Sequence, residues 1–221
     1  CTGRSGANIY FEGTPIPKDE MIRIVREKDF QALPENMREA AREATDTLLH
    51  SGDGQLCDVI IDRAALEAIL EAGNRSKAAI IRDYAESTVA VANIKIAVRC
   101  CKTGKSLEFM KRAMAPCKTL NVERLAHAAL AGIDSIMEYL SGAGYAEAAD
   151  AIKESPSAFE RWCDNRIIET IKPQKTNPFS VGPLVVIARQ NEIKTVRIIL
   201  TCKQNGLSDD SIRERVREMY V

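Results

Sequence analysis

A short joint, in which a serine follows two residues after a glycine, recurs along this chain of 221 residues. Gly104 and Ser106, in the stretch KTGKS, return 102 residues later as Gly206 and Ser208. A related stretch, CTGRS, opens the chain at residues 1–5. Because self-similarity at a fixed period indicates repeated supersecondary units, this recurrence restricts the possible folds more than composition does.

The same spacing of 102 residues relates other positions of matching character, without any insertion. These pairs are Lys95 and Arg197, Ile96 and Ile198, Val98 and Leu200, Cys100 and Cys202, Asp62 and Asp164, Leu66 and Ile168, and Ile69 and Ile171. Few of the matches are identities, so the repeat is divergent. We therefore predict two helical units of about one hundred residues each, at 1–104 and 105–221.

The residue types at the joint are those that commonly connect two helices. Gly104 and Gly206 each follow an apolar helical pattern, where a left-handed residue commonly ends a helix, and we expect a positive φ at both. The serine two residues later is a good N-cap. After Ser208, two acidic residues suit the first turn of a helix, and Ile212, Val216 and Met219 would share one face of it.

A competing interpretation is a phosphate-binding loop, because Gly104-Lys105-Ser106 also ends the pattern G-x-x-x-x-G-K-[ST]. The first glycine of that pattern is replaced here by Arg99. Upstream, residues 94–98 could form a strand, but the length and spacing of the apolar residues favour a helix. We therefore expect no nucleotide site at this joint.

Most of the chain has helical periodicity. Apolar residues fall on one face in residues 37–48 and again in residues 123–140, at spacings of three and four. Pro34 marks a helix entry, and breaks are expected at residues 13–17 and 172–183, which contain several prolines. The predicted fold class is all-α, a multi-helix protein of repeated helical units.

Composition excludes several functional classes. The net charge is zero, which gives no general attraction for nucleic acid, and no apolar run is long enough for a membrane helix. Seven scattered cysteines, odd in number, suggest a reducing cytoplasm. Because His50 and His127 lie apart from cysteines and carboxylate pairs, we expect no metal site.

The repeated aspartates Asp62 and Asp164 could form a carboxylate site. One aspartate per unit among apolar residues is more often a helix cap or a core hydrogen-bond partner. We therefore expect no catalytic residues, and no cofactor.

The C-terminal sequence resembles that of the C subunit of archaeal and bacterial V-type (A-type) ATP synthases, a relative of the eukaryotic V-ATPase d subunit. The matching parts are Asn177-Pro178-Phe179, Gly182-Pro183, residues 191–199, Asn205-Gly206 and residues 212–221, with looser matches at 13–17, 93–106 and Asp164-Asn165. The stretch MAPCKTLN around Cys117 departs from the family, which tends to have glycines there.

This resemblance implies an all-α protein of three similar units, without catalytic residues, that seats the central shaft of a rotary ATPase on the membrane rotor ring. Its partners would be shaft and ring subunits, with no nucleic acid, nucleotide or membrane insertion, and its location the cytoplasmic side of the membrane. The alternatives are a helical-repeat scaffold with an unrelated partner and a nucleotide-dependent enzyme built around Lys105.

The opening stretch CTGRS matches the middle of a unit, so we expect a helical segment before Cys1 to be absent. If three units form a closed set, the C-terminal hairpin, residues 183–221, would then present apolar surface. Its helix from Leu184 to Cys202 is apolar on more than one side, as in a helix buried all round. We expect such a chain to self-associate.

Overall fold

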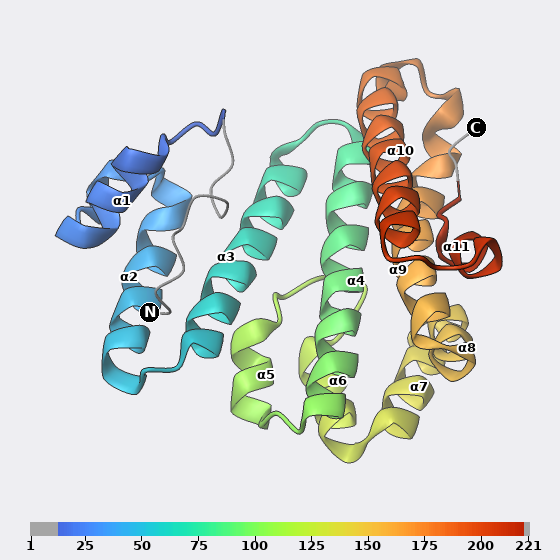
Figure 1. The fold of residues 1–221 in the computed structure, drawn as a ribbon, viewed down its shortest axis with the longest axis horizontal. Coiled ribbons are helices and arrows are strands. Elements are labelled where there is room, and N and C mark those ends of the chain that lie inside the picture. Colours follow the sequence, from blue (N-terminus) through green and yellow to red (C-terminus); the bar gives the residue numbers. More distant parts are fainter. Residues whose placement is uncertain (1–12, 219–221) are drawn as a thin grey trace. The chain divides into compact units, whose positions relative to one another are not determined.

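The computed structural model describes residues 13–218, and that part of the chain contains helices and turns only, which confirms the all-α prediction (Figure 1). The helices are α1 Lys18–Glu27, η1 Phe30–Ala32, α2 Glu35–Ser51, α3 Gly54–Arg75, α4 Ala79–Thr103, α5 Leu107–Ala113, α6 Val122–Ala131, α7 Ile133–Gly142, α8 Ala146–Glu154, α9 Pro156–Ile171, η2 Lys172–Thr176, η3 Pro178–Ser180, α10 Val181–Gln204 and α11 Asp209–Arg215. The opening stretch CTGRS lies outside the described residues.

The chain divides into two compact units, and the boundary at Ala64 and Ala65 falls inside α3. This division follows packing and does not test internal repetition, so the repeat units 1–104 and 105–221 stay a prediction. In the first unit, α2 begins directly after Pro34, as predicted. A small core there consists of Ile24, Phe30 and Leu33, with Ile16, Met21 and Ala41 packed around it.

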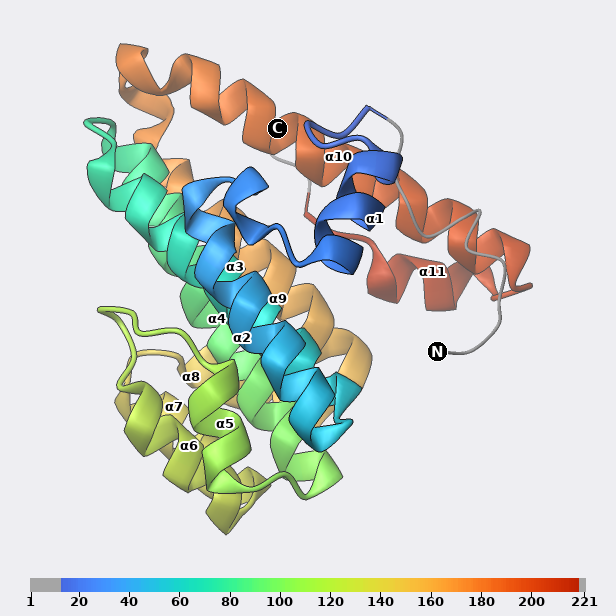
Figure 2. The ribbon, with the colours of Figure 1, turned by 90° about the vertical axis from the view of Figure 1, so that its left-hand side faces the viewer.

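The second unit is organised around α4, a helix of 25 residues. Its sequence lacks glycine and proline until Gly104, and its alanine, valine and isoleucine residues are buried on several sides. Figures 1 and 2 show α5 to α8 around the C-terminal half of α4, whereas α9 runs along it. The main core joins α4 to these helices. This packing fixes the position of the joint at Gly104, which directly follows α4.

The helical face predicted for residues 123–140 is divided between two helices. Gly132, with φ of 135°, ends α6 and precedes α7. The apolar residues at helical spacing are nevertheless buried: Leu125, Ala129, Ile136 and Leu140 all lie in the main core. Periodicity therefore identified the buried residues correctly, but it missed a change of direction that only glycine permits at this φ.

The last helix is shorter than its apolar pattern suggested. α11 ends at Arg215, and Val216 is extended, with φ of −65° and ψ of 139°. The predicted helical face through Ile212, Val216 and Met219 is therefore wrong at Val216, and Met219 lies outside the described residues. The chain instead returns along α9 and α10, where side chains of those helices hold it.

Candidate functional site

The joint at Gly104 is closed by its own hydrogen bonds. Gly104 has φ of 62°, which confirms the predicted left-handed residue. The backbone N–H of Lys105 donates to the Cys100 carbonyl oxygen at 3.0 Å. Ser106 Oγ then accepts from the Phe109 N–H at 3.2 Å and caps α5. These bonds satisfy backbone groups that helix ends otherwise leave unpaired.

The second joint repeats this geometry 102 residues later. Gly206 has φ of 69°, and the Leu207 N–H donates to the Cys202 carbonyl oxygen at 3.0 Å. Ser208 Oγ accepts from the Ser211 N–H at 3.3 Å. The helices that follow, α5 and α11, have seven residues each. The equivalence of the two joints is therefore structural as well as sequential.

The Gly104 joint differs from a phosphate-binding loop in its surroundings. Arg99, at the position of the first glycine, lies within α4, so the preceding element is a helix and not a strand. The Lys105 ammonium group lies 5.0 Å from the centre of the Phe109 ring. A loop that cradles phosphate needs free backbone N–H groups. Here the N–H groups of Gly104, Lys105 and Phe109 already have acceptors within the joint.

One buried asparagine holds the chain after each of the two short helices, α5 and α11, and sequence reasoning missed both residues. Asn93, fully buried in α4, donates to the Ala115 carbonyl oxygen at 2.7 Å and accepts from the Ala115 N–H at 3.0 Å. Asn191 in α10 donates to the Glu218 carbonyl oxygen at 2.6 Å. A polar amide inside an apolar helical run was the available signal, because such a group is rarely buried unpaired.

The aspartates Asp62 and Asp164 have different surroundings. Asp164, with a side chain 10% exposed, forms ion pairs with Lys194 and with Arg217. Asp62 lies in α3 and is exposed. The predicted role as a core partner therefore holds for Asp164 and not for Asp62. The two cations next to Asp164 neutralise its charge, which does not suit this carboxylate for acid–base chemistry.

The histidines and cysteines that the sequence singled out are dispersed. His50 is exposed, and its Nδ1 lies 2.7 Å from the Asp46 carbonyl oxygen. The six cysteines within the described residues are free thiols, and Cys1 lies outside that range. Burial raises the pKa of Cys163 to about 12, so its reactive thiolate is scarce at neutral pH. In residues 13–218, no group of three His, Cys, Asp or Glu residues could hold a metal ion.

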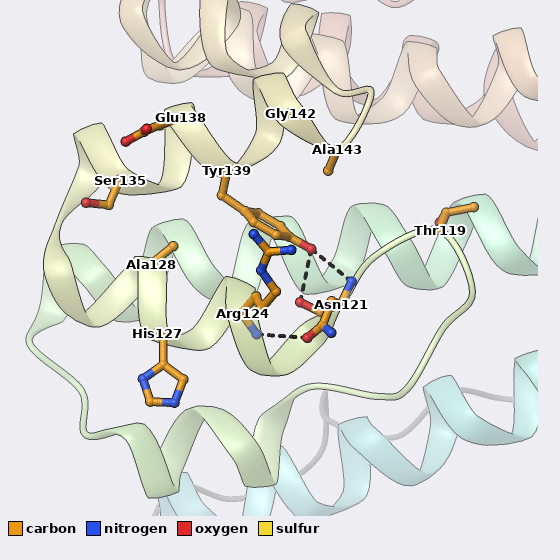
Figure 3. Close-up of a pocket in the computed structure, with 10 residues that line it drawn as sticks. All are labelled: Thr119, Asn121, Arg124, His127, Ala128, Ser135, Glu138, Tyr139, Gly142 and Ala143. Carbon is orange, nitrogen blue, oxygen red and sulfur yellow. Dashed lines mark hydrogen bonds between the residues drawn. The ribbon is translucent and has the colours of Figure 1, made fainter.

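An open hollow of about 720 Å³ lies between α6 and α7 (Figure 3). The Tyr139 hydroxyl accepts from the Asn121 N–H at 2.8 Å and donates to the Asn121 carbonyl oxygen at 3.0 Å. Burial raises the pKa of Tyr139. Figure 3 shows His127 and Glu138 pointing in different directions, so they form no acid–base pair. The hydrogen bonds tie α7 to the start of α6, which is a structural role.

A second hollow, of about 500 Å³, lies between α9, α10 and the chain after α11. Its lining includes four basic side chains, Lys194, Arg197, Arg215 and Arg217, and one carboxylate, Glu160. Two of the cations, Lys194 and Arg217, are already paired with Asp164. This surface is therefore positively charged but partly neutralised.

None of the helices among the described residues has the length and apolar character needed to cross a membrane. This finding agrees with the absence of a long apolar run in the sequence.

Comparisons with known proteins agree with the resemblance in the C-terminal sequence. The A-type ATP synthase C subunit of Desulfurococcus sp. strain SY is 29% identical over 148 residues, which are 63% of this chain and 40% of that protein. The corresponding A-type ATP synthase protein of Haloquadratum walsbyi is 34% identical over 87 residues, 37% of this chain and 25% of that protein. This chain therefore spans less than half the length of either relative.

No solved structure matches the chain significantly. The family model described as ATP synthase (C/AC39) subunit, however, matches residues 4–215, nearly the whole sequence. Together with the helical fold and the two equivalent joints, this match shows that the chain belongs to the ATP synthase C/AC39 subunit family.

Proposed function

We propose that this chain is a non-catalytic central-stalk subunit of a V/A-type rotary ATPase, which couples the central shaft to the membrane rotor ring during ATP-linked proton or sodium transport. The observation that carries the proposal is the family match over residues 4–215. Shaft and ring subunits would be its partners, and it would work through shape and surface contacts, without nucleotide or cofactor.

The packing of the second unit suits a part that transmits force. A coupler must keep its shape under load, and a close-packed interior with satisfied polar groups does so. α4 provides such an interior, because its buried Asn93 fixes the chain after α5 and its Lys95 pairs with Glu160 of α9. The helix joints are closed by backbone bonds, which limits hinge motion at Gly104 and Gly206.

The proposed location is the cytoplasmic side of the membrane, peripheral to it. Because the described helices could not cross a bilayer, attachment to the ring would depend on protein contacts. The positively charged hollow that Arg197 and Arg215 line is a candidate contact for an acidic partner surface.

The experiment that tests this function is affinity purification of the tagged protein from membranes of its source, solubilised in a mild detergent. Shaft and ring subunits should be recovered together with ATPase activity. The matched variant Lys105→Ala should recover the same subunits with the same activity, because we expect no nucleotide site at the Gly104 joint. Recovery of an unrelated protein, with neither shaft nor ring, would instead favour the scaffold alternative.

A further inference from the structure

The chain after α11 forms a strap, residues 216–218, that lies along α9 and α10. The Glu218 N–H donates to Asn165 Oδ1 of α9 at 3.1 Å, and Asn191 Nδ2 of α10 donates to the Glu218 carbonyl oxygen at 2.6 Å. Both backbone groups of one residue are thus held by side chains of two different helices. The strap therefore has one defined position against these helices.

The side chains of the strap are held mainly by charge. Arg217, which is 9% exposed, pairs with Asp164 of α9. Asp164 pairs also with Lys194 of α10. At the surface, Lys172 Nζ lies 3.0 Å from Glu218 Oε2. Ion pairs and hydrogen bonds therefore provide most of the attachment.

The equivalent segment after α5 is held by apolar packing instead. Met114 and Ala115, at the spacing of 102 residues from Val216 and Arg217, are 2% and 0% exposed, and Met114 belongs to the main core. By contrast, the strap contributes no side chain to the three apolar clusters in residues 13–218. Segments with few buried apolar contacts open locally at low free energy, so the strap is the part of this unit suited to opening.

Release of the strap leaves no buried charge without a partner. When Arg217 moves into water, Asp164 keeps its ion pair with Lys194, whose side chain is 51% exposed. A buried carboxylate that lost its only partner would strongly oppose such opening. Lys194 therefore lowers the free energy of the open state relative to the closed one.

The residues at the strap also line two hollows of the second unit. Arg217 lines the hollow of about 500 Å³. Asp164 and Asn191 line a smaller one of about 170 Å³, and Lys194 lines both. Because Arg217 and its partner Asp164 belong to different hollows, the contact between them lies where the two hollows meet.

We propose that residues 216–218 are a releasable strap, which leaves α9 and α10 while the main core stays folded. Its release joins the two hollows into one groove along these helices. The pair of Arg217 with Asp164 closes the strap, and Lys194 makes the open state accessible. A groove of this kind is absent from the closed structure and becomes available only through opening.

Amide hydrogen exchange of the whole chain, resolved by residue with NMR, tests the proposal. The Glu218 N–H reports on the strap, and the Ala115 N–H, which donates to Asn93, reports on the core. Arg217→Gln should speed Glu218 exchange roughly tenfold and leave Ala115 exchange unchanged, because only the strap loses its charged contact. Arg213→Gln, at an exposed position of α11, is the matched control and should change neither rate.

Lys194→Met separates a releasable strap from a static network of ion pairs. In the static network, removal of Lys194 weakens the whole cluster and speeds Glu218 exchange. In the proposed device, Arg217 becomes the sole partner of Asp164, so the open state is penalised and Glu218 exchange should slow severalfold.

Unchanged or faster Glu218 exchange in Lys194→Met therefore overturns the proposal. Equal exchange rates for the Glu218 and Ala115 amides of the unchanged chain also overturn it, since the strap then opens only together with the core. The same holds if Arg217→Gln leaves Glu218 exchange as it was.

Discussion

Replacement of Asn93 by alanine is the sharpest test of how the joint after α4 is held. The Asn93 side chain is fully buried and meets both backbone groups of Ala115, at 2.7 Å and 3.0 Å. Ala115 is itself fully buried, so the variant leaves a backbone N–H and a carbonyl oxygen inside the core without these partners.

The expected loss of folding stability follows from the backbone N–H and carbonyl oxygen of Ala115 that lose their partners. A buried polar group that loses its partner costs about 1–3 kcal/mol, and the cavity left by the amide adds to this. We therefore expect Asn93→Ala to lower the free energy of unfolding by about 2–5 kcal/mol. Asn191→Ala should cost only about 1 kcal/mol, because Asn191 donates one hydrogen bond, to the exposed Glu218.

Chemical denaturation followed by fluorescence of Trp162, the single tryptophan, measures both values. Asn205→Ala is a suitable control, because the Asn205 side chain is exposed and should change stability by less than about 0.5 kcal/mol. If Asn93→Ala costs no more than Asn205→Ala, with an unchanged denaturant slope, the Asn93 hydrogen bonds do not stabilise the joint and the reasoning is wrong.

Three further predictions concern the joints and the core. Gly104→Ala and Gly206→Ala should each cost about 1–2 kcal/mol, because both glycines have left-handed φ with open space around them, whereas Gly142→Ala, in a helix at ordinary φ, should not destabilise. Calorimetric titration with ATP and magnesium should show no saturable heat, and micromolar binding that Lys105→Ala removes would refute this. Cys163 should resist alkylation at pH 8, because burial raises its pKa from 9.0 to about 12. The buried neutral thiol contributes folding stability that is fully present below about pH 9 and is lost as pH rises toward 12, where the folded protein must ionise it.

The joints were predictable from the sequence because their chemistry is local. A left-handed residue at the end of a helix strongly favours glycine, and the N-cap of the next helix favours serine. Gly104, Ser106, Gly206 and Ser208 therefore mark helix ends at fixed positions whatever packs around them. The family resemblance and the all-α fold class rested on equally local signals, helical periodicity and a C-terminal block of matching residues.

Features that depend on tertiary contacts were not predictable in this way. The sequence could not distinguish Asp62 from Asp164, because the difference is whether Lys194 and Arg217 lie nearby. The break at Gly132 was missed because apolar spacing continues across it and all the residues concerned reach the same core. The sequence predicted apolar residues on more than one side of α10, but which of them are exposed depends on how α10 packs against α9.

The Gly104 and Gly206 joints also show why backbone requirements persist between similar segments while side-chain contacts move. Thr195 occupies the position of Asn93, is 5% exposed, and its hydroxyl forms no hydrogen bond within the described residues. Asn191, one helical turn earlier, holds the returning chain instead. An amide can reach that chain from either turn of the long helix, whereas φ near 65° at the joint favours glycine at one position only. Substitutions can therefore relocate the buried asparagine without moving the joint, and a search for identical residues detects the glycines and misses the contacts that hold the chain after each joint.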